Sequence, residues 1–376
     1  MKSNNSGLAL RSASAIVEGA QDYIELFKQC NGNDAAQKAH LRKEYMRYAK
    51  VLHPDLYTDP EEIKIAEESF RKMQEFLAEA EQAIKEGTYG KAKPKIIFET
   101  KSSTHILNKR IATGDISDIY KAETTTGTLS YSTIVKVTRD PNDNDLSINE
   151  QNVLKKLQKA KDLDTLKPFV TKLADSFNYT DTVGEHNVNV IENPADGFID
   201  IETLRNKYFP DGLPAKHAAW IWRRVLLGLE LAHETGIVHG ALVPSNILIQ
   251  PELHGVVVSD WSYAVDVRKP SHRVTAIVNA KKDWYPPEVL AKEQPYSGTD
   301  TYMAAQSMIW LMGGDPISKK FPDNVPIEIQ RYFKGCTVNS KIGRPDDAIE
   351  LLKEFDELLK SIGKPYHPRK FVPLTI

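Results

Sequence analysis

Residues 236–246 read Gly-Ile-Val-His-Gly-Ala-Leu-Val-Pro-Ser-Asn, and an apolar run, Ile-Leu-Ile, follows at 247–249. Asp260 directly follows a second run, Val-Val-Val-Ser, at 256–259. Short β-branched runs bounded by polar residues are typical of buried strands. The stretch therefore predicts a polar loop ending in Asn246, a strand, a second strand, and then Asp260.

Composition limits the class of protein before any motif is considered. The chain has 376 residues, a length typical of two or three domains. Of these residues, 41% are hydrophobic and 27% charged, as in ordinary soluble globular proteins. A net charge of −2 argues against a nucleic-acid partner, and no apolar run approaches the ~18 residues of a membrane span. Cys30 and Cys336 lie far apart and suit a reducing compartment. Because the first residues also lack the apolar core of a signal peptide, we expect a cytoplasmic protein without a membrane partner.

Residues 17–90 predict a helical first domain, preceded by a disordered Ser/Asn/Ala-rich segment at 1–16. A short helix over 22–27 is followed by a turn at 31–34 that supplies an N-cap. A second helix must end at His53, because the residue before Pro54 avoids the α region. Asp59 and Pro60 predict the start of a third helix. The apolar stripes of the two long helices are Leu41, Tyr45, Tyr48 and Leu52, and Phe70, Met73, Leu77, Ala80 and Ile84.

Two amphipathic helices joined by a loop that starts His53-Pro54-Asp55, with a basic second helix before the loop, resemble a J domain. The resemblance implies docking to an Hsp70-type chaperone and stimulation of its ATP hydrolysis. It assigns the chaperone contact to the loop, and the basic face would attract an acidic partner surface. The expected contact residues are His53, Pro54, Asp55, Arg42, Lys43 and Arg47. The alternative is a plain helical hairpin with a solvated basic face.

A linker is expected at 91–103, and a second, larger domain at 104–360 with a tail at 361–376. The opening stretch resembles the catalytic loop and metal-binding segment of protein kinases. His239 stands at the family's His-Arg-Asp histidine, Asn246 at its metal-binding asparagine, and Asp260 at its Asp-Phe-Gly aspartate. The implied fold class is α+β: a small helical J domain, then a kinase-like N-lobe at 104–193 and C-lobe at 194–360.

Three further residues match the family's nucleotide-binding positions. Gly114 lies in a segment similar to the glycine-rich loop, although Ala112 and Ser117 replace the other two glycines. Lys136 lies inside a β-branched run where the family has its phosphate-contacting lysine; the alternative is a solvated, outward-facing lysine. Glu150, on a helix expected over 146–157, is its natural partner, with a helix-dipole role as the alternative. The resemblance implies ATP and Mg²⁺ as cofactors, the metal being held by Asn246 and Asp260.

Scaffold motifs extend the resemblance over most of the second domain. Residues 214–234 predict an apolar helix that delivers His239, and Asp300 opens a long central helix. Glu288, in a segment similar to the family's Ala-Pro-Glu motif, is expected to pair with Arg344. Residues 261–284 are either an activation segment, with Ser271 and Thr275 as phosphate acceptors, or a solvated basic loop.

The sequence departs from the family where proton transfer takes place. Ala241 replaces the catalytic aspartate, Gly240 the neighbouring arginine and Val243 the nearby lysine. A methyl group accepts no proton, so the resemblance predicts a pseudokinase that binds Mg-ATP without efficient transfer, or a scaffold that binds nothing. As a whole protein it would then be an Hsp70 co-chaperone with a regulatory kinase-like module, and a protein client would be a further partner. The alternative is an atypical active Ser/Thr kinase using another carboxylate, with Asp266 nearest.

Overall fold

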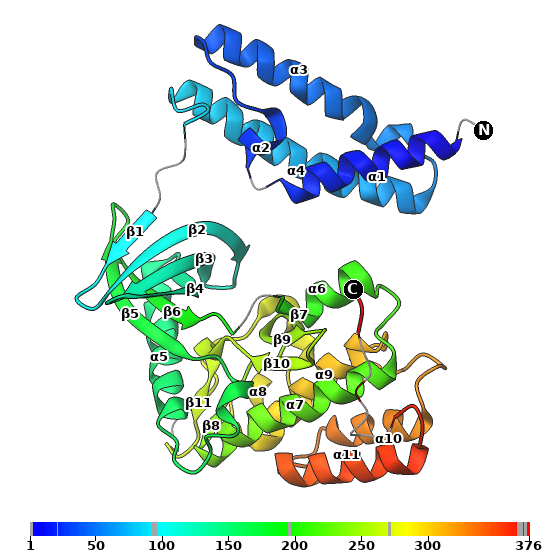
Figure 1. Cartoon of the computed structure of the whole chain (residues 1–376). Coiled ribbons are helices and arrows are strands. Elements are labelled where there is room, and N and C mark those ends of the chain that lie inside the picture. Colours follow the sequence, from blue (N-terminus) through cyan, green and yellow to red (C-terminus); the bar gives the residue numbers. More distant parts are fainter. Residues whose placement is uncertain are drawn as a thin grey trace. The chain divides into compact units, whose positions relative to one another are not determined.

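The computed structural model describes residues 3–20, 22–91, 96–194, 197–269, 272–366, 371 and 374–376. The chain divides into two compact units, Met1–Ile96 and Ile97–Ile376. The first is built from helices, and the second has a sheet-rich lobe followed by a mainly helical lobe (Figure 1). The α+β class expected from the sequence is confirmed. Within the described part of the chain, no helix combines the length and apolar character that crossing a membrane requires.

The short helix expected over 22–27 and the helix expected to end at His53 lie where the sequence predicts, and the next helix starts where Asp59 and Pro60 predict. Helix α2 spans Tyr23–Phe27, α3 Asp34–Leu52 and α4 Pro60–Lys85. The Asn33 side chain accepts a hydrogen bond from the Ala36 N–H, and Asp59 accepts from the first turn of α4. His53 has an extended backbone, with φ −66° and ψ 124°, so α3 stops before Pro54. A 3₁₀ turn, η1 (Pro54–Leu56), then leads toward α4.

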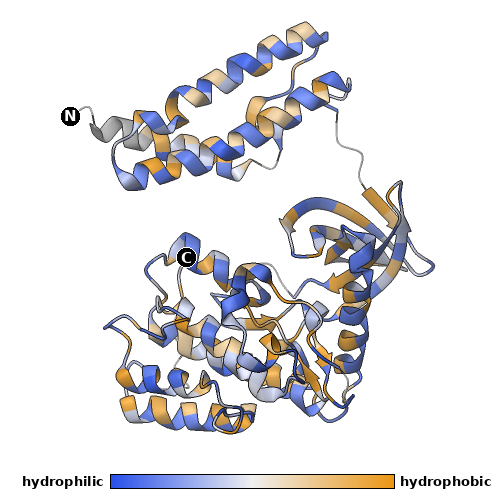
Figure 2. Ribbon diagram, turned by 180° about the vertical axis from the view of Figure 1, so that it is seen from behind, coloured by the Kyte–Doolittle hydropathy of each residue, from blue (hydrophilic) through white to orange (hydrophobic). Residues whose placement is uncertain are grey.

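The facing stripes of α3 and α4 form the core of this unit. Hydrophilic and hydrophobic residues alternate along both helices (Figure 2). The buried members of the two stripes are Leu41, Tyr48, Leu52, Met73, Ala80 and Ile84, with Tyr45, Phe70 and Leu77 partly buried at the edge. The two helices are therefore held together by apolar burial.

The first segment differs from the expectation of disorder over residues 1–16. Helix α1 spans Ser3–Gly19, and Leu10 and Val17 are fully buried in the helical unit's core. The Ser69 hydroxyl donates to the Ser14 hydroxyl at 2.7 Å, which joins α1 to α4. The prediction of disorder was wrong because it used composition alone. Leu10 and Val17 recur at helical spacing among small polar residues, and their tertiary packing outweighs the weak helix propensity of the segment.

The sheet lobe is a six-stranded antiparallel sheet in the order β1-β2-β3-β4-β6-β5. The strands are β1 (Ile96–Glu99), β2 (Ser103–Thr113), β3 (Ser117–Thr126), β4 (Leu129–Thr138), β5 (Leu173–Thr180) and β6 (Glu185–Glu192). Two short 3₁₀ turns, η2 (Pro141–Asp143) and η3 (Lys167–Phe169), flank α5 (Asn144–Gln158), which packs against β6. The linker expected at 91–103 is shortened, since β1 and the start of β2 fall within it; residues 92–95 lie outside the described part.

The second lobe surrounds a buried central helix, α9 (Ser297–Leu311). Its other helices are α6 (Ile201–Tyr208), α7 (Ala215–Glu234), α8 (Pro287–Leu290), α10 (Ile327–Cys336) and α11 (Ala348–Ile362). Short strands and turns lie between them: β7 (Ile199–Asp200), β8 (Ile237–Val238), η4 (Pro244–Asn246), β9 (Ile247–Gln250), β10 (Gly255–Val258), η5 (Trp261–Tyr263), β11 (Val265–Asp266) and η6 (Asn279–Trp284). In the tail expected at 361–376, Leu374 is buried in this lobe's core; residues 367–370 and 372–373 lie outside the described part.

Candidate functional site

The β9–β10 hairpin brings Asn246 and Asp260 together. Ile247 at the start of β9 pairs with Val258 at the end of β10, so the residues before and after the hairpin meet at its open end. The Ser259 N–H donates to the Asn246 carbonyl at 2.9 Å. Asp260 follows with a left-handed backbone, φ 60° and ψ 73°, a conformation that a non-glycine residue seldom adopts away from turns and functional sites.

A buried ion cluster connects Asp260 to the sheet lobe. The Lys136 ammonium on β4 donates to both Glu150 oxygens, at 2.7 and 2.8 Å, and to Asp260 Oδ1 at 3.0 Å. The Lys136 side chain is 10% exposed and that of Glu150 2%, which excludes the alternative of a solvated lysine. Burial favours the neutral amine, yet the two carboxylates raise the pKa of Lys136 above its ordinary value. Burial likewise opposes ionisation of Asp260, but Lys136 and the Ser262 hydroxyl lower its pKa.

Helix α5 is fixed to the segment that follows Asp260. Glu150 also accepts from the Trp261 N–H at 3.2 Å and from the Asn189 amide at 3.0 Å. The neighbouring Asn149 amide donates to the carbonyls of Ser262 at 3.0 Å and Ala264 at 2.8 Å. Glu150 lies in the second turn of α5, so its role is that of an ion-pair partner and not of a first-turn dipole charge.

Asp300 on α9 holds the loop between β8 and η4. Its carboxylate is fully buried and accepts from the backbone N–H groups of His239 at 2.7 Å and Gly240 at 2.9 Å. His239 Nδ1 accepts from the Ala241 N–H, so His239 Nε2 must donate to the Ser259 carbonyl. Burial lowers the pKa of His239 and keeps it neutral. His239 is thus a scaffold residue, as expected from the sequence.

No proton acceptor stands at the position of Ala241. Its side chain is fully buried, and Val243 beside it is almost so. The sequence-based alternative, Asp266, is unsuitable because its carboxylate is committed elsewhere. Its Oδ2 accepts from the Lys156 ammonium at 2.8 Å, and its Oδ1 accepts from the Arg268 N–H at 3.2 Å. Although partial burial opposes ionisation, Lys156 lowers the pKa of Asp266.

The loop that contains Gly114 connects β2 to β3 and is restrained on two sides. The Gly114 N–H donates to the Ser117 carbonyl at 2.8 Å. The Arg139 guanidinium donates to the carbonyls of Gly114 at 2.8 Å and Asp115 at 2.6 Å. The Tyr263 hydroxyl donates to the Asp115 carboxylate, and this contact joins the loop to the segment after Asp260. The loop therefore lies over the same region as the ion cluster.

The expected pair of Glu288 and Arg344 is present and buried. Arg344 Nη1 donates to Glu288 Oε1 at 2.5 Å and Nη2 to Oε2 at 3.2 Å, while both residues are at most 3% exposed. A two-pronged arginine–carboxylate bond of this kind fixes geometry as well as charge. It attaches the start of α8 to the loop before α11.

The site thus unites Gly114, Lys136, Glu150, Asn246 and Asp260, and sequence reasoning missed the residues that hold them. Asp300, Arg139 and Asn149 act on backbone groups, which no side-chain motif displays. The sequence indicates Asp300 only as the start of the central helix and does not predict its role in holding backbone N–H groups. Of the expected phosphate acceptors, Ser271 lies outside the described residues and Thr275 is exposed.

The oxygen donors fit Mg²⁺. The Asn246 Nδ2 donates to the Ala241 carbonyl at 2.9 Å, which commits the nitrogen end of the amide. The amide oxygen accepts only a long 3.4 Å hydrogen bond from the Ser245 hydroxyl, which a cation could displace. Asp260 supplies a carboxylate at the same end of the hairpin. No group of three or more His, Cys, Asp or Glu side chains suited to a metal occurs among the described residues. A two-donor set nevertheless suits Mg²⁺, which is commonly bound by one or two protein oxygens together with phosphates and water.

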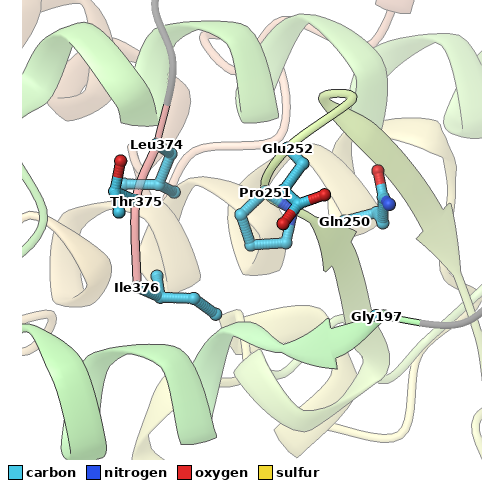
Figure 3. Close-up of a pocket in the computed structure, with 7 residues that line it drawn as sticks. All are labelled: Gly197, Gln250, Pro251, Glu252, Leu374, Thr375 and Ile376. Carbon is cyan, nitrogen blue, oxygen red and sulfur yellow. The ribbon is translucent and has the colours of Figure 1, made fainter.

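A separate cavity of about 520 Å³ lies at the far end of the same hairpin. Gln250, Pro251 and Glu252 line it at the β9–β10 turn, facing the terminal residues Leu374–Ile376 (Figure 3). Asn246 and Asp260 stand at the opposite, open end of β9 and β10. The cavity is therefore not part of the Lys136 cluster.

Comparison with known proteins agrees with this geometry. Residues 106–365 match the family described as "Protein kinase domain", which includes both lobes and leaves the helical unit outside. No curated protein matches the chain. The match covers more than half of the chain and contains Gly114, Lys136, Glu150, Asn246 and Asp260 in the family's order. The chain belongs to the protein kinase family.

Proposed function

We propose that the kinase unit binds Mg-ATP and transfers its phosphoryl group poorly or not at all. The Lys136 ammonium would contact the phosphates, while Asn246 and Asp260 would hold the metal. Nucleotide binding depends mainly on positioning and charge, which these residues would supply, whereas Val243 lacks the further positive charge that would stabilise transfer. ATP would bring the reactive phosphoanhydride bond.

The observation that carries the proposal is the fully buried methyl group of Ala241. The nearby titratable groups do not replace a base. His239 has both ring nitrogens engaged, and Asp300 is fully buried and bonded to backbone N–H groups. A positioned general base is worth ~10²–10⁴ in rate, so its loss leaves binding intact and slows transfer. The intact Lys136–Glu150 pair supports binding but adds no base.

Two measurements on the full chain test the proposal. Mg-ATP should raise the thermal midpoint of the wild type, and Asp260→Ala should abolish that shift. Transfer of radiolabelled phosphate to a generic protein substrate should stay at background. Rapid transfer that Asp260→Ala abolishes would instead establish the alternative, an atypical active Ser/Thr kinase.

We further propose that the helical unit is a J domain that docks an Hsp70-type chaperone. His53 and Asp55 are exposed directly after α3, and the His53 ring rests edge-on against Phe70 with 5.1 Å between centroids. The cations of α3 are also exposed: Arg42, Lys43 and Arg47. An exposed loop beside a basic helix face supports capture of an acidic chaperone surface.

Stimulation of the cognate Hsp70 ATPase by the full chain tests this second proposal. His53→Gln should remove the stimulation, and a triple charge change at Arg42, Lys43 and Arg47 should weaken it more at low salt than at high salt. Lys64→Gln, an exposed lysine on α4, is the matched control. No stimulation by the wild-type chain would refute the J-domain interpretation.

A further inference from the structure

Two tryptophans and two cations gather where α6, η6 and α9 meet. The Arg205 guanidinium lies 4.2 Å from the Trp310 ring centroid, and the Lys281 ammonium lies 5.5 Å from the same ring. Lys281 also lies 4.7 Å from Trp284, and the two indole centroids are 6.2 Å apart. All four side chains are half-buried, so the cluster is ordered yet open to solvent.

The two cations differ in whether they have an ion-pair partner. Lys281 forms a 2.8 Å ion pair with Glu202 on α6. Arg205 forms no such pair within the described residues, and its Nη1 atom is buried without a hydrogen-bond partner. Burial accordingly lowers the pKa of Arg205. A guanidinium that is partly desolvated and unpaired is costly, and an added carboxylate would relieve that cost.

Stacking prepares Arg205 to recognise an anion. The planar guanidinium presents its donors as a rigid fork that matches a carboxylate, and stacking on an indole reduces the freedom lost on binding. Tryptophan and arginine are also the residues that most often dominate binding energy at protein interfaces. An extended peptide could cover Trp284 with its apolar parts and place an acidic side chain on Arg205.

We propose that this cluster binds an acidic peptide segment of a partner protein and contacts the carboxylates of that peptide. The cluster is formed by Arg205, Lys281, Trp284 and Trp310. Glu202 holds Lys281 in position and leaves Arg205 as the unpaired cation. Because Arg205 Nη1 is covered, binding requires a small outward movement of the guanidinium. Neither Lys136 nor Asp260 belongs to the cluster, so its peptide binding can be tested without Mg-ATP.

The test uses the full chain and fluorescein-labelled peptides with five Glu-Gly repeats, and the matching Gln-Gly peptide, measured by fluorescence anisotropy. The Glu peptide should bind at least tenfold more tightly than the Gln peptide. Arg205→Gln should remove most of that preference, and Arg205→Lys should restore little of it because lysine lacks the fork. Lys207→Ala is the matched control on the exposed face of α6 and should change nothing.

Every other outcome counts against the proposal. Equal affinity for the two peptides, absence of saturable binding, or an unchanged preference in Arg205→Gln would overturn it. A phosphoserine version that binds more than tenfold tighter than the Glu peptide would reassign the site to phosphorylated partners. If Arg205→Gln fails to fold, Lys281→Gln and competition by free Glu peptide on the wild type replace it, with the same outcomes.

Discussion

Replacing Glu150 with glutamine would test the ion cluster on which the proposed nucleotide binding depends. The change keeps the side chain's shape and removes its charge, leaving Lys136 with Asp260 as its sole carboxylate partner in the cluster. Breaking a buried ion pair costs ~3–5 kcal/mol. Because Asp260 remains 3.0 Å from the ammonium, we expect the lower end, about 3 kcal/mol.

The five tryptophans make the measurement specific. Residues 220, 222, 261, 284 and 310 all lie in the kinase unit, so intrinsic fluorescence follows the unfolding of that unit and not of the helical one. At ~2 °C per kcal/mol for a unit of this size, Glu150→Gln should lower the midpoint by about 6 °C. It should also weaken Mg-ATP binding, since Lys136 would be less well positioned.

Glu99→Gln, an exposed change on β1, is the control and should leave the midpoint within about 1 °C. If Glu150→Gln behaved like this control, the cluster would contribute little and the reasoning would be refuted. If stability fell without any loss of nucleotide affinity, the cluster would be structural only.

Three further predictions concern other parts of the chain. Asp260 has a lowered pKa in the folded protein, so its ionised form stabilises the kinase unit above the unfolded pKa of ~3.9, and this stabilisation is lost as pH falls through the folded pKa. In Asp260→Asn, the unfolding midpoint followed by fluorescence should therefore fall less between pH 6 and pH 3 than in the wild type. The double change Ala241→Asp with Val243→Lys should raise phosphate transfer by ~10²–10⁴ if a base and a charge are all that is missing, and a transfer assay that stays at background would oppose this. Leu10→Ala should cost ~2–5 kcal/mol and remove hydrogen-exchange protection from α1, whereas unchanged protection would show that α1 is not held by that side chain.

The sequence was sufficient to predict those site residues that lie at fixed positions relative to apolar runs or in a fixed order along the chain. Asn246 and Asp260 flank two apolar runs, and an antiparallel hairpin brings such residues together without further information. Lys136 and Glu150 come from a strand and a helix whose order in the family is fixed. The Glu288–Arg344 pair was predicted from motif order alone, and its buried geometry agrees.

The sequence was insufficient where a side chain serves the backbone of a distant segment. Asp300 binds N–H groups sixty positions earlier, and Arg139 binds carbonyls of the Gly114 loop. Such contacts depend on tertiary geometry and leave no periodic signal. The prediction of disorder for the segment that forms α1 was wrong for a related reason. Its helicity comes from the burial of Leu10 and Val17 and not from intrinsic helix propensity.

The residues that match the family and the alanine that departs from it differ in what each contributes to folding. Asp300 and the Glu288–Arg344 pair are buried and bonded, so their loss would leave unpaired charges or backbone groups inside the protein at a cost of several kcal/mol. An aspartate at position 241 would have no such role, since the Ala241 N–H is already bonded to His239 and Asp300 already holds the loop. Its replacement by a buried methyl removes a costly charge. The fold can therefore accommodate alanine at position 241, while the contacts of Lys136 with Glu150 and Asp260 remain in place.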